Sequence, residues 1–176
     1  MLADKLCQLH GADRTMITSS GMAAMSAVAL SQLESGDHLV VSDQLYGRTL
    51  DLLVGQSPRL GATCSVIDTC DLDAVNATVT SKTKLIVAET ISNPLLRVAD
   101  IAALAKIAHA NNAKLVIDNT FASPILCRPL EKGADMVVES ISKSINGHSD
   151  VMLGAVCGRE ADWQNVPSMV SIWGLH

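Results

Sequence analysis

Residues 85–118 read LIVAETISNPLLRVADIAALAKIAHANNAKLVID. The two ends of this stretch, Leu85–Glu89 and Leu115–Asp118, are short apolar runs rich in β-branched residues, and Asp100–Asn111 between them has helical periodicity. A strand that is apolar throughout is buried on both faces of its sheet, and a helix that links two such strands leaves them parallel. The stretch therefore predicts a parallel sheet with helices packed on it.

The same alternation continues through the rest of the chain. The other predicted strands are Thr15–Thr18, His38–Ser42, Cys64–Ile67, Met136–Glu139 and Ala155–Cys157. The other predicted helices are Leu2–Leu9, Gly21–Leu33, Gly47–Gln56 and Asp71–Thr78. We expect a three-layer α/β fold, in which a mainly parallel, seven-stranded sheet is covered by helices on both faces. No linker, repeat or low-complexity tract interrupts the sequence, so we expect one domain over residues 1–176.

The composition is that of a folded, mildly acidic protein. Of the 176 residues, 48% are hydrophobic and 18% are charged, and the formal net charge is −5. Nucleic acids and anionic membranes attract clustered positive charge, which this balance does not favour. Only Tyr46, Phe121, Trp163 and Trp173 are aromatic, too few for a platform on which bases stack. We therefore expect neither nucleic acid nor membrane among the partners.

The cysteines and the chain ends bear on the compartment. The cysteines are Cys7, Cys64, Cys70, Cys127 and Cys157. Their odd number and the lack of a CxxC pair favour free thiols over disulfides or a zinc site, and we expect no metal. The N-terminal residues lack the pattern of a secretory signal, and the longest apolar segment, Met22–Leu30, is too short to cross a bilayer. We therefore expect a cytoplasmic protein. The end at Trp173–His176, without a capped helix or closing strand, has the character of a cut.

Polar residues gather directly after several predicted strands. These clusters are Ser19–Gly21, Asp43, Glu89–Thr90, Asp118–Thr120 and Ser140–Lys143. In an open α/β sheet, ligands bind beyond the carboxyl ends of the strands. The clusters are therefore predicted to converge on one crevice.

The first of these clusters precedes a helix of small residues. Gly21 permits close approach to the backbone, and the free N–H groups of the first helical turn can hold an anion such as phosphate. An ordinary serine cap is the other interpretation, and it is the commoner one for this pattern alone. The segment is neither a Walker loop nor a GxGxxG dinucleotide fingerprint.

Asp118 stands at the exit of a predicted strand, with apolar residues before it. A carboxylate in this position can pair with a cation held in the crevice, such as a protonated ring nitrogen. It can equally cap the turn that follows, for which the Asp118-Asn119 pair is well suited. On the residues alone we give these two interpretations equal weight.

Residues 140–150 read SISKSINGHSD, in which Lys143 follows two hydroxyl residues at alternating positions, Ser140 and Ser142. The hydroxyls can bind phosphate oxygens while the lysine amine reaches a carbonyl group, and an enclosed lysine of this kind can form a Schiff base. A solvated lysine on a polar loop is the commoner fate of this residue type. What favours the functional interpretation is the combination of this stretch with the helix start and the strand-end aspartate.

Pyridoxal 5′-phosphate (PLP) carries the three groups for which these sites are suited: a phosphate, a pyridinium nitrogen and an aldehyde. The sequence resembles the cystathionine γ-synthase group, the Cys/Met-metabolism enzymes of PLP fold type I. The resemblance covers nearly the whole chain, through the collinear stretches SSGMAAMSAV, SDQLYGRT, VAETISNPLLRVADI, VIDNTFASPILCRPLEKGADMVVES and SISKSINGHSD and the Trp-Gly-Leu-His end. It implies PLP as cofactor and the large, PLP-binding domain of that fold.

The resemblance also implies roles for individual residues. Lys143 matches the lysine that binds the cofactor covalently and later moves protons, and Asp118 matches the acid that keeps the pyridine nitrogen protonated. Tyr46 matches the tyrosine that stacks on the cofactor and takes part in proton transfer. Family members most often have threonine where Ser142 stands. The full set of expected cofactor-binding residues is Ser20, Gly21, Met22, Tyr46, Asn93, Asp118, Thr120, Ser140, Ser142 and Lys143.

Members of this family catalyse elimination or replacement at Cβ or Cγ of sulfur amino acids, so the resemblance implies a small amino-acid substrate. The family's N-terminal segment, which reaches the neighbouring subunit's phosphate, and its C-terminal domain, which holds the substrate carboxylate, have no counterpart in these residues. The alternative is therefore a catalytically incompetent PLP-binding or structural fragment. An apolar surface that the absent parts would cover promotes association, so we expect a homo-oligomer.

Overall fold

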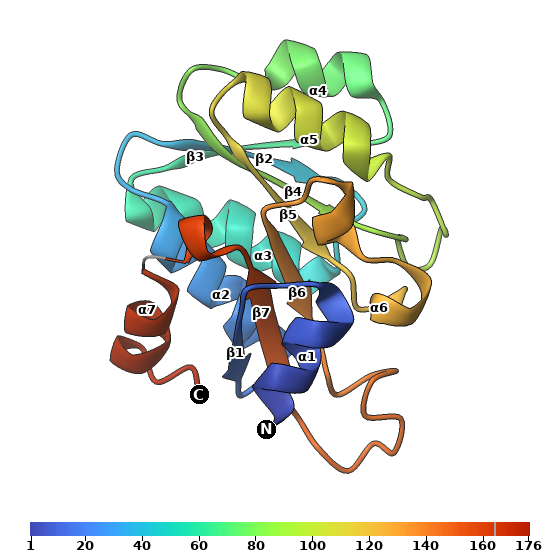
Figure 1. Ribbon diagram of the computed structural model, residues 1–176. Coiled ribbons are helices and arrows are strands. Elements are labelled where there is room, and N and C mark those ends of the chain that lie inside the picture. The colour runs from blue at the N-terminus through green and yellow to red at the C-terminus, as the bar shows by residue number, and fades with distance from the viewer. Residues whose placement is uncertain (164) are drawn as a thin grey trace.

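The computed structural model describes residues 1–163 and 165–176 and is shown in Figure 1. Within these residues, seven strands form one sheet in the order β1-β7-β6-β5-β4-β2-β3. They are β1 (Arg14–Thr18), β2 (His38–Ser42), β3 (Thr63–Ile67), β4 (Thr83–Glu89), β5 (Lys114–Asp118), β6 (Met136–Glu139) and β7 (Gly154–Gly158). From β3 to β6 the neighbours are parallel, while β7 runs antiparallel to β6 and β1. The expected mainly parallel sheet is confirmed.

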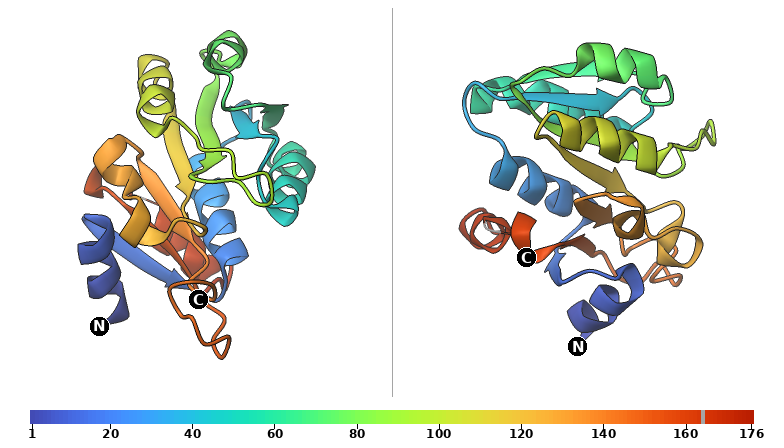
Figure 2. Two further views of the ribbon diagram at one scale, coloured as in Figure 1. Left: turned by 90° about the vertical axis from the view of Figure 1, so that its right-hand side faces the viewer. Right: turned by 45° about the horizontal axis from the view of Figure 1, so that its top comes forward.

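Helices cover both faces of this sheet, as the two views of Figure 2 show. One face carries α2 (Gly21–Gln32), α3 (Gly47–Gln56) and α7 (Val166–Ile172). The other carries α1 (Leu2–His10), α4 (Leu72–Thr78), α5 (Ile101–Ala110) and the short α6 (Ser123–Leu126), which packs against α1. Turns of 3₁₀ helix lie at η1 (Ser57–Leu60), η2 (Pro129–Lys132) and η3 (Glu160–Asp162). This is the three-layer arrangement that the sequence predicts.

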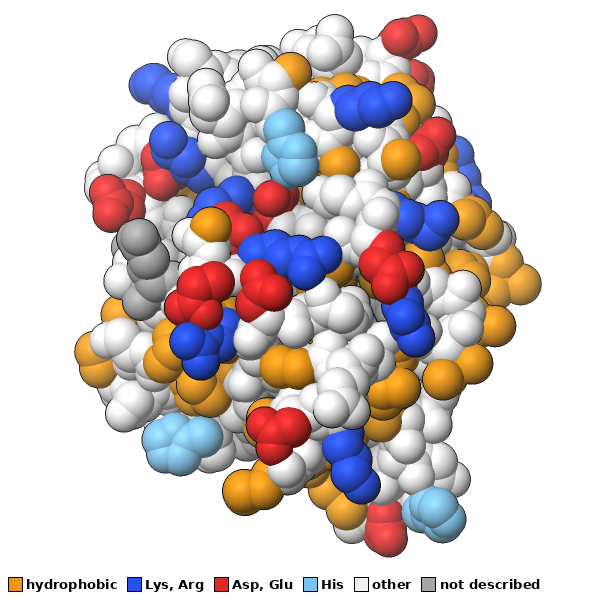
Figure 3. All heavy atoms as spheres, viewed as in Figure 1, with side chains coloured by type: hydrophobic (Ala, Val, Ile, Leu, Met, Phe, Trp, Pro, Cys, Tyr) orange, Lys and Arg blue, Asp and Glu red, His pale blue; other side chains and the backbone are white. Residues whose placement is uncertain are grey.

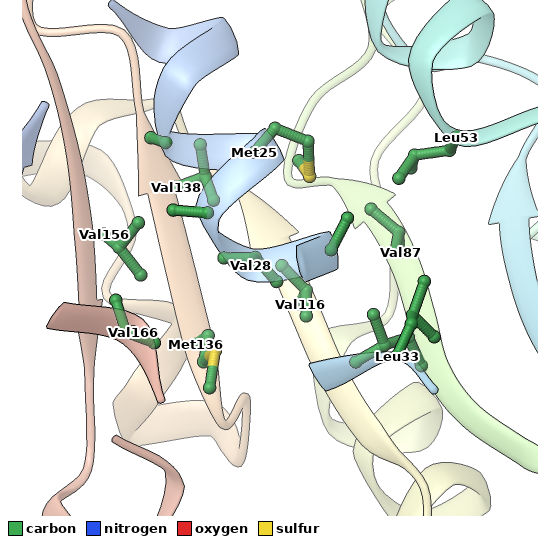
Figure 4. Close-up of a cluster of buried hydrophobic side chains, with 14 of the residues drawn as sticks. Met25, Val28, Leu33, Leu53, Val87, Val116, Met136, Val138, Val156 and Val166 are labelled. Carbon is green, nitrogen blue, oxygen red and sulfur yellow. The ribbon is translucent and has the colours of Figure 1, made fainter. Parts of the chain in front are cut away.

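The largest core cluster lies between the sheet and α2. Met25 and Val28 of α2 are buried among Val87, Val116 and Val138, one residue from each of β4, β5 and β6 (Figure 4). Full burial of a side chain of this size contributes about 1.5–3 kcal/mol. Four of the buried residues of α2 are alanines, and their small side chains allow the helix to pack closely on the sheet.

The residues that alternate with these face the opposite helices. Leu115 and Ile117 of β5 pack with Leu104 of α5, on the other side of the sheet from Val116. Because both faces of the central strands are covered, β4 is apolar from Leu85 to Ala88 and β5 from Leu115 to Ile117, as expected for buried parallel strands. The same alternation of side chains between the two faces continues past the end of β5: Asp118 and Thr120 line a cavity, and Asn119 between them is fully buried.

The first turn of α2 is pressed against β7. A Cβ atom built on Gly154 would lie 2.1 Å from the Ser20 carbonyl oxygen and 2.7 Å from the Gly21 nitrogen. Only glycine fits at this position, because both neighbours are backbone atoms that cannot rotate away. The contact fixes where the exposed N–H groups at the start of α2 stand relative to the sheet.

The predicted strands and helices are all present, with ends that differ by no more than two residues. The expectation that no capped helix stands near residue 176 is wrong. α7 ends at Ile172, and the N–H of the following Trp173 donates to the Met169 carbonyl at 3.1 Å. Val166 and Val170, four residues apart, bury one side of this helix. A single pair of buried residues in a seven-residue helix is too short a pattern to recognise in the sequence.

The surface agrees with the mixed composition. On the face seen in Figure 3, acidic and basic side chains are interspersed rather than gathered into a block of one sign. Among the residues that the structure describes, no helix combines the length and the apolar character that crossing a membrane requires. The five cysteines are all free thiols.

Candidate functional site

A cavity of about 570 Å³ opens beyond the carboxyl ends of β4, β5 and β6. All ten residues that the sequence predicts for the cofactor site line it, so the structure brings the whole set together. They are Ser20, Gly21, Met22, Tyr46, Asn93, Asp118, Thr120, Ser140, Ser142 and Lys143. Thr49, Glu89, Phe121, Ser144 and Met152 complete the lining.

These residues converge because of the parallel sheet. Glu89 and Asp118 are paired in register as the last residues of β4 and β5, and the chain after β6 leaves the sheet at the same edge. The segment between β6 and β7, which extends from the sheet at the lower right of Figure 1, carries the lysine. The crevice expected from the strand-end clusters is therefore present, at the edge where such folds bind ligands. Four of the five predicted clusters contribute to its lining, but Asp43, directly after β2, does not.

The start of α2 forms one wall of the cavity. Ser20 caps the helix, since its Oγ accepts the Ala23 N–H at 3.1 Å, so the ordinary cap that the sequence left open is present. The N–H groups of Gly21 and Met22, in the first turn, have no partner within the helix. A Cβ atom on Gly21 would lie 2.9 Å from the Ser140 Cβ. The missing side chain thus leaves a cradle for a small anion between helix start and Ser140.

Asp118 stands on the side of the cavity formed by β5. Its Oδ1 accepts the Thr120 N–H at 3.0 Å, so it also makes the turn that was its alternative interpretation. Burial raises the pKa of this carboxyl, and the hydrogen bonds from Thr120 oppose that rise. Among the described residues Asp118 forms no ion pair. A partly buried carboxyl group that forms no ion pair is suited to a ligand that supplies a cation.

Glu89 connects the strand edge to the tyrosine. Its Oε1 accepts the Tyr46 N–H at 2.7 Å, at the start of α3, which holds the exposed Tyr46 ring beside the cavity. Burial raises the pKa of Glu89 to about 7, the charge of Asp118 adds to that rise, and the N–H groups of Tyr46 and Asn93 oppose it. The sequence places Glu89 in a strand-end cluster but gives it no role. Its place at the end of the strand next to that of Asp118 is the signal by which it could have been found.

Lys143 and Ser142 lie on the loop that follows β6 and differ in their contacts. Lys143 is exposed at the cavity, rather than enclosed as the sequence pattern indicated. Its N–H donates to the Ser140 carbonyl in a turn that follows β6. The Ser142 Oγ donates to the Leu153 carbonyl at 3.1 Å and accepts the Leu153 N–H at 2.9 Å, which ties the two ends of the loop together. Lys143 is therefore free to reach into the cavity from a braced loop.

Among the described residues, no three histidine, cysteine, aspartate or glutamate side chains are grouped so that they could hold a metal ion. The cavity instead offers backbone donors for a phosphate, a carboxyl group for a ring cation and an amine for a carbonyl, each on a different wall. A PLP molecule carries these groups around one ring, and the fold places them at the strand ends where α/β proteins bind cofactors. Fold and cavity together define a PLP-binding protein.

Comparison with known proteins narrows this class. The chain belongs to the Cys/Met metabolism PLP-dependent enzyme family, whose model matches residues 1–174. An L-methionine gamma-lyase from Fusobacterium nucleatum subsp. polymorphum is 41% identical over 157 residues, which are 89% of this chain and 40% of that protein. A cystathionine gamma-synthase from Mycobacterium bovis is 46% identical over 138 residues, 78% of this chain and 36% of that protein.

Solved structures agree with the fold. A cystathionine gamma-lyase from Lactobacillus plantarum, crystallised with L-serine, superposes with a TM-score of 0.92 at 38% identity, over 97% of this chain and 45% of that one. The chain spans about two fifths of the length of the curated relatives named above. The family and its cofactor are thus shown, as the sequence resemblance implies, while the activity of the whole protein is a matter for proposal.

Proposed function

We propose that this chain is the cofactor-binding domain, residues 1–176, of a PLP-dependent enzyme that eliminates or replaces a substituent at Cβ or Cγ of a sulfur amino acid. The observation that carries the proposal is that Lys143, Asp118 and the first turn of α2 line one cavity. The relatives support it, because their names cover a methionine gamma-lyase and a cystathionine gamma-synthase, both of which act on sulfur amino acids.

The residues of the cavity would hold the cofactor by three groups. Gly21, Met22 and Ser140 surround the cradle that suits its phosphate, and Asp118 would pair with its ring nitrogen. Tyr46, whose ring is 59% exposed, is placed to cover the ring of the cofactor. When bound, PLP supplies an electron-withdrawing ring that stabilises negative charge on the α-carbon of the amino acid.

The chain's own groups then divide the work of moving protons. Lys143 Nζ would be the base placed to take the proton from the α-carbon of an amino acid held in the cavity. Asp118, whose carboxyl accepts the Thr120 N–H, would keep the ring nitrogen of the cofactor protonated. The Tyr46 hydroxyl would be a second acid or base in the same cavity.

Turnover is the test of this proposal. With PLP and L-methionine or L-cystathionine, neither of which carries a free thiol, we expect the chain to release one thiol for each amino acid consumed, with ammonia and a 2-oxo acid as the other products of elimination. A thiol-reactive dye and a coupled 2-oxo acid assay measure the two products separately. If the chain binds PLP but none of these substrates yields thiol above the level of PLP alone, it is the incompetent fragment of the alternative hypothesis.

The proposal includes assembly and compartment. Tyr46, Phe121 and Met152, which line the cavity, are exposed, as are Ile125 and Leu126 of α6. Burying such side chains against a second copy would stabilise an oligomer and close the cavity. Five free thiols support a reducing, cytoplasmic location.

Association with itself is measurable directly. Because large apolar side chains are exposed on and beside α6, we expect the sedimentation coefficient of the purified chain to rise with concentration. Replacing Ile125 and Leu126 with serine should reduce that rise without changing the circular dichroism spectrum. A single monomeric species at the highest concentration reached would contradict the oligomer.

A further inference from the structure

Behind the cavity, on the other side of the strand ends, lies a second layer of polar side chains. His10, Asn119 and Glu139 are each 0% exposed and Thr90 is 3% exposed. Thr90, Asn119 and Glu139 each adjoin in sequence a residue that lines the cavity, and His10 contacts Glu139. Buried polar groups in such number are destabilising unless they satisfy one another, so the group calls for an explanation.

Hydrogen bonds connect these residues across three neighbouring strands. The Thr90 hydroxyl donates to Asn119 Oδ1 at 2.6 Å, and Asn119 Nδ2 donates to Glu139 Oε1 at 3.0 Å. Asn119 Nδ2 also donates to the Cys127 carbonyl at 3.0 Å. We call Thr90, Asn119, Glu139 and His10 the buried polar layer. It runs across the carboxyl ends of β4, β5 and β6 to the last turn of α1.

The last contact of the layer is between α1 and β6. His10 Nε2 lies 3.4 Å from Glu139 Oε1. Within the part of the chain that the structure describes, neither ring nitrogen of His10 nor Glu139 Oε2 has a hydrogen-bond partner. A small movement of either side chain would turn this contact into a hydrogen bond at His10 Nε2.

Their charge states fit a neutral contact. Burial raises the pKa of Glu139 to about 8, with a contribution from the charge of Asp118 and an opposing one from the Asn119 hydrogen bond. Burial lowers the pKa of His10 to about 4, and the Arg128 guanidinium adds to that. At a pH between these two pKa values, a protonated carboxyl group faces a neutral imidazole. The carboxyl O–H can then donate a hydrogen bond to the ring, and neither buried group carries a charge.

The layer alternates with the residues of the cavity. Successive residues of an extended chain point to opposite sides, so Asn119 lies between Asp118 and Thr120, which line the cavity, and Glu139 precedes Ser140. Further hydrogen bonds join the segments after β5 and β6: the Ser140 N–H donates to the Thr120 hydroxyl oxygen at 2.8 Å, and the Asn119 N–H donates to the Val138 carbonyl at 2.9 Å. A shift of one layer must therefore move the other.

We propose that Glu139 is a positioning residue for the cofactor site, which, through its contacts with Asn119 and His10, holds the strand ends so that Asp118, Thr120 and Ser140 face the cavity in their binding arrangement. Glu139 itself touches neither cofactor nor substrate. The inference rests on the proposed cofactor site for its consequence, while the hold on the strand ends belongs to the chain without any ligand.

Glu139→Leu, which keeps the bulk but removes the polar contacts, is the disruptive variant. Glu139→Gln keeps both contacts, and the pair His10→Glu with Glu139→His exchanges them. We measure hydrogen exchange of the Thr120 and Ser140 amides without cofactor, and PLP affinity by visible absorbance. For Glu139→Leu we expect exchange at these amides to be about 10-fold faster and PLP affinity about 10-fold weaker, with Glu139→Gln and the exchanged pair within about 3-fold of the parent.

A matched control separates positioning from general loss of stability. Val75→Ala, in α4, truncates a side chain that is 0% exposed in the core cluster shared with α5 and that does not line the cavity. Should Glu139→Leu fail to fold, Thr90→Val breaks the far end of the layer with almost no change of shape and is expected to speed the same exchange. The proposal is overturned if these variants leave the Thr120 and Ser140 amides as protected as in the parent, or if Val75→Ala exposes them equally. A parent without a PLP band contradicts the proposed function alone, because the exchange measurement does not use the cofactor.

Discussion

Replacement of Lys143 by alanine is expected to remove the visible absorption band that the chain acquires with added PLP, and to reduce thiol release to the level of PLP alone. Lys143 is the only lysine among the residues that line the cavity, so no other amine there can bind the aldehyde of the cofactor. The same amine is the base placed at the substrate's α-carbon, which is why both properties should be lost together. The measurements are an absorption titration with PLP and the thiol assay.

The control is Lys106→Ala, which removes an exposed lysine from α5, outside the cavity. It is expected to leave both the band and the turnover unchanged. Circular dichroism of the two variants checks that each is folded. A band of undiminished strength in Lys143→Ala would show that PLP reacts elsewhere on the chain, and it would remove the basis for placing the cofactor in this cavity.

The substitution Asp118→Asn is expected to have the next largest effect. Asparagine keeps the shape of the side chain and can still accept the Thr120 N–H, but it has no charge to hold a ring nitrogen in its protonated form. We expect turnover to fall by about 100-fold or more, as when a single electrostatic contact to developing charge is removed. PLP affinity should fall less, since phosphate and aldehyde contacts remain. Steady-state thiol release and the PLP titration measure the two effects.

Asp71→Asn provides the comparison. Asp71 caps α4, where its side chain accepts the Ala74 N–H, and it lies outside the cavity. Asparagine is as good a cap as aspartate, so this variant should match the parent in turnover, affinity and stability. If Asp118→Asn turned over substrate at the parent's rate, the buried carboxyl group would be serving only the turn that it makes with Thr120.

The fold was predictable from the sequence because the central strands are buried on both faces. Leu85–Glu89 and Leu115–Asp118 are apolar almost throughout, and each is followed by a break in that pattern. The antiparallel direction of β7 cannot be seen in its sequence, because Gly154–Gly158 is as apolar as the central parallel strands of the sheet. Helix α7 could not be predicted from the sequence, because its one pair of buried residues, Val166 and Val170, makes no periodic pattern.

The site was predictable to the extent that it follows strands. Asp118, Thr120 and Ser140 could be placed at one edge because parallel strands end together, and the family resemblance supplied their roles. The contact between Glu89 and the Tyr46 N–H could not be predicted, because it joins groups 43 positions apart through a backbone donor. The buried polar layer was missed for a different reason. Asn119 and Glu139 alternate with cavity residues, and only packing shows what lies behind them.

The most direct test of the cofactor site is to trap PLP where it binds. The chain is incubated with PLP, treated with borohydride to convert the bond between lysine and cofactor into a stable amine, digested and mapped by mass spectrometry. If the cavity at the ends of β4, β5 and β6 is the PLP site, the label is on Lys143 and is displaced by an amino acid added before the borohydride. A label spread over Lys5, Lys84 and Lys106, or a chain that carries none, would contradict it.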